Sequence, residues 1–223
     1  MTIHIFCDFD GTITETDNIA SVMKHFVPEQ AKPIIDQVLA KEIAIKDGVE
    51  AMFHLLPTSS KDDILSFLHD TAIIREGFAD FVAFTKEQGI PFSVVSGGID
   101  FFVEPMLAPY GPFNHIFCNS SDFSGDTIQV LYPYACDEQC PNVETQACGC
   151  CKPSIMRSLV QDDTFSIVIG DSVTDFEAAK HADLVFARDI LIDKCEEMNI
   201  AYRPFTTFND CLQYVKEVLE VKR

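Results

Sequence analysis

Short apolar runs alternate with longer segments of helical periodicity along this chain. Four runs, at residues 3–7, 91–95, 165–169 and 184–187, are nearly continuous in hydrophobicity and rich in β-branched or aromatic side chains. Such runs are typical of strands that are buried on both faces of a parallel sheet. Because helical segments separate them, the pattern predicts an α/β fold built around an open parallel sheet.

The segment from residue 16 to about residue 70 contains amphipathic helices and no convincing strand. Its apolar positions recur at helical spacing in three groups: Ile19, Val22, Met23 and Phe26; Val49, Met52, Phe53 and Leu56; Ile64, Leu65 and Leu68. We interpret residues 15–74 as a small helical cap inserted into a core domain made of residues 1–14 and 75–223. A closing cap would exclude water and select substrates. The alternative is that these helices simply pack on a face of the sheet.

The remaining segments complete the predicted core. A helix is expected from Phe78 to about Gln88, and a strand with a hairpin over residues 114–134. Helices near residues 190–198 and 209–218 follow the last predicted strand, which we expect to lie at the edge of the sheet.

Length and charge narrow the class of partner. A chain of 223 residues with 47% hydrophobic residues can bury a sizeable core. Its formal charge of −19 argues against a nucleic-acid or anionic-membrane partner, because the overall field repels phosphate. We find neither a signal peptide nor an apolar stretch long enough to span a membrane, and we expect a cytoplasmic protein.

Two acidic residues follow the first apolar run. Asp8 and Asp10 leave an extended chain on the same side, and Gly11 allows a sharp turn just beyond them. Buried carboxylates are costly unless they are paired, and ligands of open α/β sheets bind at the carboxyl ends of strands. A bound cation with a phosphorylated small molecule is therefore the expected partner. Asp10-Gly11 is also a common turn dipeptide, which is the alternative interpretation.

Three later groups follow predicted strands or precede helices. Ser96-Gly97-Gly98 follows the strand at residues 91–95 and could bring a hydroxyl and backbone N–H groups to an anion at the start of a helix. Lys152 precedes Pro153, which suits the first turn of a helix. Asp171 and Asp175 lie four positions apart after the strand at residues 165–169. Each group has an ordinary structural explanation when it is taken alone.

Together, Asp8-Phe9-Asp10-Gly11-Thr12, Ser96-Gly97-Gly98, Lys152 and Gly170-Asp171-Ser172-Val173-Thr174-Asp175 resemble, in order, the four motifs of the haloacid-dehalogenase-like phosphotransferases. The helical insert and Arg75-Glu76-Gly77 are similar to the phosphoserine-phosphatase branch. The resemblance implies a Rossmann-like core and a magnesium-dependent phosphatase that forms an aspartyl-phosphate. It implies that Asp8 is the nucleophile, that Asp10 acts as acid and base, and that Lys152 neutralises negative charge. The residues implied to bind magnesium are Asp8, Asp10, Asp171 and Asp175. Those implied to contact the phosphate or the rest of the substrate are Thr12, Ser96, Gly97, Glu15 and Arg75.

One departure bears on the substrate. Thr174 stands where phosphoserine phosphatases usually carry asparagine, which disfavours phosphoserine. Another small phosphorylated metabolite is expected, with phosphoserine or a similar phosphomonoester as the alternative. A protein without catalytic activity that binds a metal or a partner through its cysteines is the alternative from another class.

Five of the nine cysteines fall between residues 136 and 151. Cys136, Cys140, Cys148, Cys150 and Cys151 could place four thiolates around zinc, although they do not form two standard C-x-x-C pairs. A structural disulfide is less expected in a cytosolic protein. Zinc binding, a redox role and reduced thiols that pack a loop all remain open from the sequence.

Overall fold

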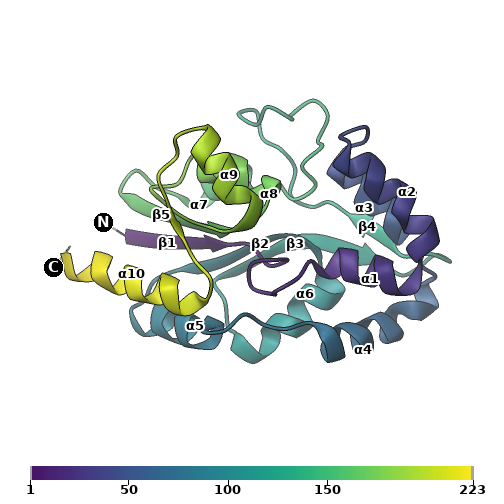
Figure 1. Ribbon diagram of the computed structural model, residues 1–223, viewed down its shortest axis with the longest axis horizontal. Coiled ribbons are helices and arrows are strands. Elements are labelled where there is room, and N and C mark those ends of the chain that lie inside the picture. Colours follow the sequence, from purple (N-terminus) through teal and green to yellow (C-terminus); the bar gives the residue numbers. More distant parts are fainter. Residues whose placement is uncertain (1, 222–223) are drawn as a thin grey trace.

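A seven-stranded sheet forms the centre of the computed structural model, which describes residues 2–221 (Figure 1). The strand order is β4-β3-β2-β1-β5-β6-β7. Only β4 runs antiparallel to its neighbour, β3. The strands are β1 (Thr2–Cys7), β2 (Phe92–Ile99), β3 (His115–Asp122), β4 (Gln129–Leu131), β5 (Thr164–Gly170), β6 (Leu184–Ala187) and β7 (Tyr202–Pro204). The predicted α/β fold with a parallel sheet is confirmed.

Burial explains why the apolar runs become strands. In β1 every residue after Thr2 is buried, and the strand lies in the middle of the sheet between β2 and β5. The hairpin of β3 and β4 lies where the sequence predicts it, and residues 184–187 form the predicted strand β6. The expectation that this strand lies at the edge of the sheet was wrong, because β7 pairs with its outer side. The edge strand β7 was missed, because it has only three residues and two of them, Arg203 and Pro204, are exposed.

Helices cover both faces of the sheet (Figure 1). One face carries α5 (Phe78–Glu87), α6 (Asp100–Leu107) and α10 (Phe208–Val221). The buried Phe78 and Phe81 of α5 both contact Phe208 at the start of α10. The other face carries α7 (Lys152–Leu159), α8 (Val173–Ala179) and α9 (Asp189–Glu197). The two helices predicted near the end of the chain correspond to α9 and α10.

The helical segment after β1 lies beyond the carboxyl ends of the strands, on the right of Figure 1. It contains α1 (Asn18–Phe26), α2 (Pro28–Leu39), α3 (Ile45–Phe53) and α4 (Lys61–Thr71), with a short 3₁₀ turn at Thr58–Ser60. The two segments that connect these helices to the sheet lie side by side. Thr14 forms a β-bridge with Ile74, and the Arg75 N–H donates to the carbonyl of Ile13. The division of the chain into a core and a cap at these residues stays a prediction.

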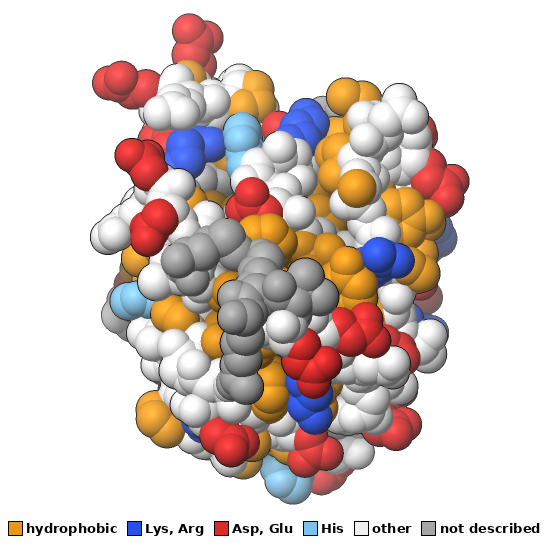
Figure 2. Space-filling view, turned by 90° about the vertical axis from the view of Figure 1, so that its left-hand side faces the viewer, with side chains coloured by type: hydrophobic (Ala, Val, Ile, Leu, Met, Phe, Trp, Pro, Cys, Tyr) orange, Lys and Arg blue, Asp and Glu red, His pale blue; other side chains and the backbone are white. Residues whose placement is uncertain are grey.

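The opposite end of the sheet shows a mixed surface. On the face where β1 begins, acidic and basic side chains are interspersed with apolar ones (Figure 2). Among residues 2–221, no helix is both long enough and apolar enough to cross a membrane.

Candidate active site

The acidic ends of two neighbouring strands meet at the carboxyl edge of the sheet. Cys7 and Ile169 are paired in register on β1 and β5, and the Asp8 N–H donates to the Ile169 carbonyl at 2.9 Å. One carboxylate oxygen each from Asp8, Asp171 and Asp175 lies within 4.8 Å of the others. The expected convergence of Asp8 and Asp171 is therefore present in the structure, because the carboxyl ends of parallel strands share one edge.

Lys152 is the cation at this cluster. It is the first residue of α7, and its side chain is almost completely buried. Its Nζ lies 2.8 Å from Oδ1 of Asp8 and 2.6 Å from Oδ1 of Asp175. Burial by itself lowers the pKa of Lys152, but the carboxylates of Asp175 and Asp8 outweigh it and raise the pKa above its ordinary value. The side chain is therefore an ammonium ion at neutral pH.

Negative charge still exceeds positive charge around Asp8. Burial and the Asp175 carboxylate raise the pKa of Asp8, and the Lys152 ammonium opposes them. Burial, followed by the charge of Asp175, raises the pKa of Asp171 to about 6. The cluster thus contains three carboxylates and one lysine. A further positive charge would therefore stabilise the ionised carboxylates.

Both carboxylate oxygens of Asp175 accept hydrogen bonds. The backbone N–H groups of Asp171 and Ser172 donate to its Oδ2 at 3.2 and 3.1 Å, while Lys152 donates to Oδ1. With Ser172 it forms the capping box that begins α8. We expected Asp175 among the magnesium ligands. In the structure Asp175 holds Lys152 and the turn that carries Asp171, and its carboxylate is one of the three that lie within 4.8 Å of one another.

Asp10 lines the same cavity as Asp8 and Asp171. The backbone and side-chain N–H groups of Asn18 donate to its Oδ1 at 3.0 and 2.7 Å. Burial, followed by the charge of Asp17, raises the pKa of Asp10 to about 7. A Cβ on Gly98 would lie 2.8 Å from the Asp10 Oδ2, so the glycine leaves space for this carboxylate. Asn18 was missed from the sequence, and its signal is a polar residue at the buried start of an amphipathic helix.

Thr12 and Arg75 bind other protein groups. The Thr12 hydroxyl donates to Oδ1 of Asp171 at 2.7 Å. The buried Arg75 guanidinium donates to the carbonyls of Gly11, Thr12 and Thr14. Both were expected at the substrate. In the structure, Thr12 orients Asp171 and Arg75 holds the turn, because the turn after β1 has carbonyls that need donors.

Ser96-Gly97-Gly98 does not form a turn between strand and helix. Strand β2 continues through these residues to Ile99, with an irregular register against β3 between Val95 and Ile99. The Ser96 hydroxyl accepts a hydrogen bond from the Gly98 N–H at 2.8 Å, and Gly97 is exposed to the cavity above Asp8. This irregular part of β2, rather than the start of a helix, brings Gly97 to the cavity, whereas the Ser96 side chain is buried and does not line it.

A cavity of about 500 Å³ opens above these residues. Its floor includes Asp8, Asp10, Gly11, Gly97 and Asp171, and Glu15 and Asp17 lie at its side. Helices α1, α2 and α3 give it an apolar wall: Ile19, Ala20, Ile35, Val38, Leu39, Ile45, Val49 and Met52. None of the described lining residues is a lysine or an arginine. This apolar wall was not recognised from the sequence, although Leu39 and Ile45 are unusually exposed large apolar residues.

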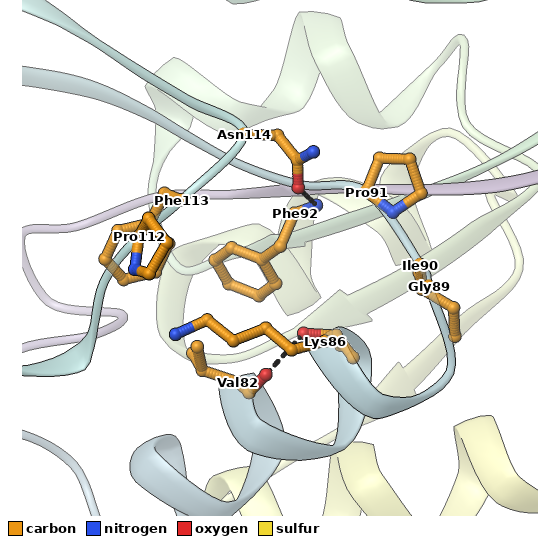
Figure 3. A pocket seen from close by; sticks show the side chains of 10 residues that line it. Val82, Lys86, Gly89, Ile90, Pro91, Phe92, Pro112, Phe113 and Asn114 are labelled. Carbon is orange, nitrogen blue, oxygen red and sulfur yellow. Dashed lines mark hydrogen bonds between the residues drawn. The ribbon is translucent and has the colours of Figure 1, made fainter.

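A second hollow lies at the opposite end of the sheet (Figure 3). It is lined by Val82 and Lys86 of α5, Phe92 at the start of β2 and the loop at Pro112–Asn114. The Lys86 ammonium donates hydrogen bonds to the carbonyls of Tyr110 and Gly111. Its lining contains no acidic side chain, and its polar side chains are those of Thr85, Lys86 and Asn114, so the cluster of carboxylates lies at the first cavity alone of these two.

Known proteins share both the sequence and the fold. The family model of haloacid dehalogenase-like hydrolases matches residues 5–180. A 2-hydroxy-3-keto-5-methylthiopentenyl-1-phosphate phosphatase of Lysinibacillus sphaericus is 56% identical over 216 residues, which cover 97% of this chain and 95% of the relative. The protein of the same name from Bacillus mycoides is 52% identical over the full length of both chains.

Solved structures agree in fold. A substrate-bound phosphoserine phosphatase superposes with a TM-score of 0.70 at 19% identity, covering 96% of this chain and 98% of that one. A phosphoserine phosphatase of T. onnurineus gives the same TM-score at 15% identity, with 97% and 95% covered. At these identities the likeness concerns the fold.

Proposed function

Since the chain belongs to the haloacid dehalogenase-like hydrolase family, we propose that it is a magnesium-dependent phosphatase acting on 2-hydroxy-3-keto-5-methylthiopentenyl-1-phosphate. The product would be 1,2-dihydroxy-3-keto-5-methylthiopentene, an intermediate of methionine salvage. Residues 15–74 would act as the cap that covers the substrate.

The donor set at the strand ends suits magnesium. Magnesium prefers hard oxygen ligands and uses only a few protein carboxylates, with water completing its shell. The carboxylates of Asp8 and Asp171 lie close together with insufficient positive charge around them. We assign the ion to these two carboxylates and the carbonyl of Asp10. When bound, it would neutralise charge on the phosphoryl oxygens.

Asp8 would be the nucleophile. Phe9 N–H and Lys152 both bind its Oδ1, at 2.8 Å each, and no other hydrogen bond to this carboxylate is found among residues 2–221. We therefore assign the attack on phosphorus to Oδ2, which forms an aspartyl-phosphate and releases the alcohol. Lys152, Ser96 and the Gly97 N–H would bind the phosphoryl oxygens, and Asp175 would hold Lys152 in place.

Asp10 would move the protons. Its pKa of about 7 allows it to be protonated when the substrate binds, so that it can donate a proton to the departing enediol oxygen. The resulting carboxylate can then take a proton from the water that hydrolyses the aspartyl-phosphate. Asn18 fixes the carboxylate for both steps through its two hydrogen bonds.

The apolar wall of the cavity carries the substrate assignment. Phosphoserine has a carboxylate and an ammonium group that need charged partners when they are desolvated. No lysine or arginine lies among the described lining residues, so a substrate carboxylate would have no cationic partner there. A methylthio chain fits a wall of isoleucine, valine, leucine and methionine. Glu15, at the side of the cavity, is the expected polar contact of the organic part.

Phosphate release from the two substrates tests the proposal. Purified protein with magnesium should hydrolyse the methylthiopentenyl phosphate with a kcat/KM far above that for phosphoserine. Asp8→Asn should be inactive on both, which excludes a contaminating phosphatase. The opposite preference would refute the substrate, and no turnover of either would refute the proposed function.

A further inference from the structure

Four of the five clustered cysteines converge in the loop between β4 and α7. The Sγ atoms of Cys136, Cys140, Cys148 and Cys151 all lie within 4.8 Å of one another. Three of these side chains are buried, and Cys148 is partly buried. The loop contains turns and bends but no strand or helix, and it is drawn in blue-green at the top of Figure 1.

Cys150 is separate from this group. Its side chain packs in a different apolar cluster with Phe6 and Val95, and its Sγ lies 3.9 Å from the Phe117 carbonyl. Once Cys150 is removed from the pattern, the remaining spacing is C-x3-C followed by C-x2-C. Both spacings fall within the range of structural zinc sites. Gly149, with φ of +69°, forms the turn between the cysteines of the second pair.

The distances fit a metal-centred tetrahedron. Four sulfurs at the usual zinc–sulfur distance of about 2.3 Å lie about 3.8 Å from one another. The Sγ atoms of Cys140 and Cys148 are 3.9 Å apart. All cysteines of the described chain are free thiols, so no disulfide closes the loop. The Cys140–Cys148 separation is the one expected for two ligands of a single zinc ion, and the other sulfur pairs lie within 4.8 Å of one another.

Two of the four clustered cysteine sulfurs accept hydrogen bonds from polar side chains. Asn142 Nδ2 donates to the Cys148 Sγ at 3.3 Å, and the Ser154 hydroxyl donates to the Cys151 Sγ at 3.0 Å. Donors of this kind orient and stabilise metal-bound thiolates. The apolar cluster in which these sulfurs lie consists of the four cysteines alone, which offer little apolar area to hold a loop closed.

We propose that Cys136, Cys140, Cys148 and Cys151 bind one structural zinc ion. The four thiols would release their protons to solvent as the ion binds, and four protein ligands leave no open position for catalysis. The ion would fix Cys151, the residue before Lys152, and so anchor the start of α7. The hydrogen bond from the Cys151 N–H to the Tyr134 carbonyl supports the same anchor. The zinc site would therefore help to position the lysine that contacts Asp8.

Metal analysis of the purified full-length protein tests this site. Protein prepared without chelator should contain about one zinc per chain by mass spectrometry of its metals. Cys148→Ser should lose that zinc, whereas Cys150→Ala should keep it, because the Cys150 sulfur faces away from the cluster. X-ray absorption at the zinc edge of the wild type should show four sulfur neighbours at about 2.3 Å. This last measurement needs no variant and remains decisive if Cys148→Ser fails to fold.

Several results would overturn the proposal. They are a wild-type protein without zinc, one equivalent of iron instead, a Cys140–Cys148 disulfide by mass spectrometry, or oxygen neighbours that place zinc at the carboxylates. Equal loss of zinc in Cys150→Ala and Cys148→Ser would also refute the ligand set. None of these measurements depends on phosphatase activity, so the proposed function stands or fails separately.

Discussion

Asn18 and Asp17 act on the protonation of Asp10 in opposite directions, which allows a sharp test of its role as proton donor. Asn18 donates two hydrogen bonds to the Asp10 Oδ1 and favours the charged carboxylate. The negative charge of Asp17 disfavours that charge and contributes to the raised pKa of Asp10. Substituting each residue separately should therefore move the pKa of Asp10 upward in one case and downward in the other.

The size of the shift follows from the hydrogen bond that is lost. In Asn18→Ala the backbone N–H remains, and of the two hydrogen bonds to Asp10 only the side-chain bond at 2.7 Å disappears, together with the bond that the Asn18 amide donates to the Thr14 hydroxyl at 3.2 Å. A hydrogen bond to a charged group contributes about 1.5 kcal/mol or more. Since one pKa unit corresponds to about 1.4 kcal/mol, the pKa of Asp10 should rise by about one unit. Asp17→Asn keeps an acceptor for the Ala20 N–H at the start of α1 and should lower the pKa.

The pH dependence of kcat/KM measures these shifts. The donor must carry its proton in the first step, so kcat/KM should fall as pH rises through about 7 in the wild type. This fall in kcat/KM on the alkaline side of the pH profile, the alkaline limb, should move to higher pH in Asn18→Ala and to lower pH in Asp17→Asn.

p-Nitrophenyl phosphate provides the control, because its leaving group departs without a proton. With this substrate the alkaline limb should be weak in the wild type and in both variants. If the limb stays in place in both variants, or moves in the same direction, the assignment of Asp10 as proton donor is refuted.

Three further predictions concern the nucleophile, the buried lysine and the cavity wall. Asp8→Asn should reduce kcat by about 10⁴-fold or more while the protein stays folded, as kinetics and circular dichroism would show. Lys152→Met leaves buried carboxylates unpaired and should lower the free energy of unfolding in urea by about 3 to 5 kcal/mol. Lys32→Met should leave it nearly unchanged, because the ion pair of Lys32 with Asp36 is exposed to solvent. Leu39→Arg should raise KM for the methylthiopentenyl phosphate and lower KM for phosphoserine; the exposed Ile73→Arg, outside the cavity lining, should change neither.

The sequence by itself determined the sheet and where its chemistry lies. Continuous apolar runs such as β1 and β5 can be satisfied only by burial on both faces, which requires a parallel sheet with helices on each side. Acids placed directly after two such strands lie at the same edge of the sheet, and here they meet because β1 and β5 are neighbours. The helical periodicity between residues 16 and 70 likewise identified the insert before its position was known.

Tertiary structure alone decided which polar atoms pair. Thr12 and Asp171 are 159 positions apart, and only the folded chain shows that the threonine hydroxyl donates a hydrogen bond to that carboxylate. In the same way the loop turns Cys150 away from the four converging sulfurs, although it is adjacent to Cys151. Hydrophobic periodicity records local burial, whereas the partner of a polar group depends on how distant segments are brought together. For that reason the sequence predicts where the candidate site lies, whereas the three-dimensional structure shows which polar groups within it contact one another.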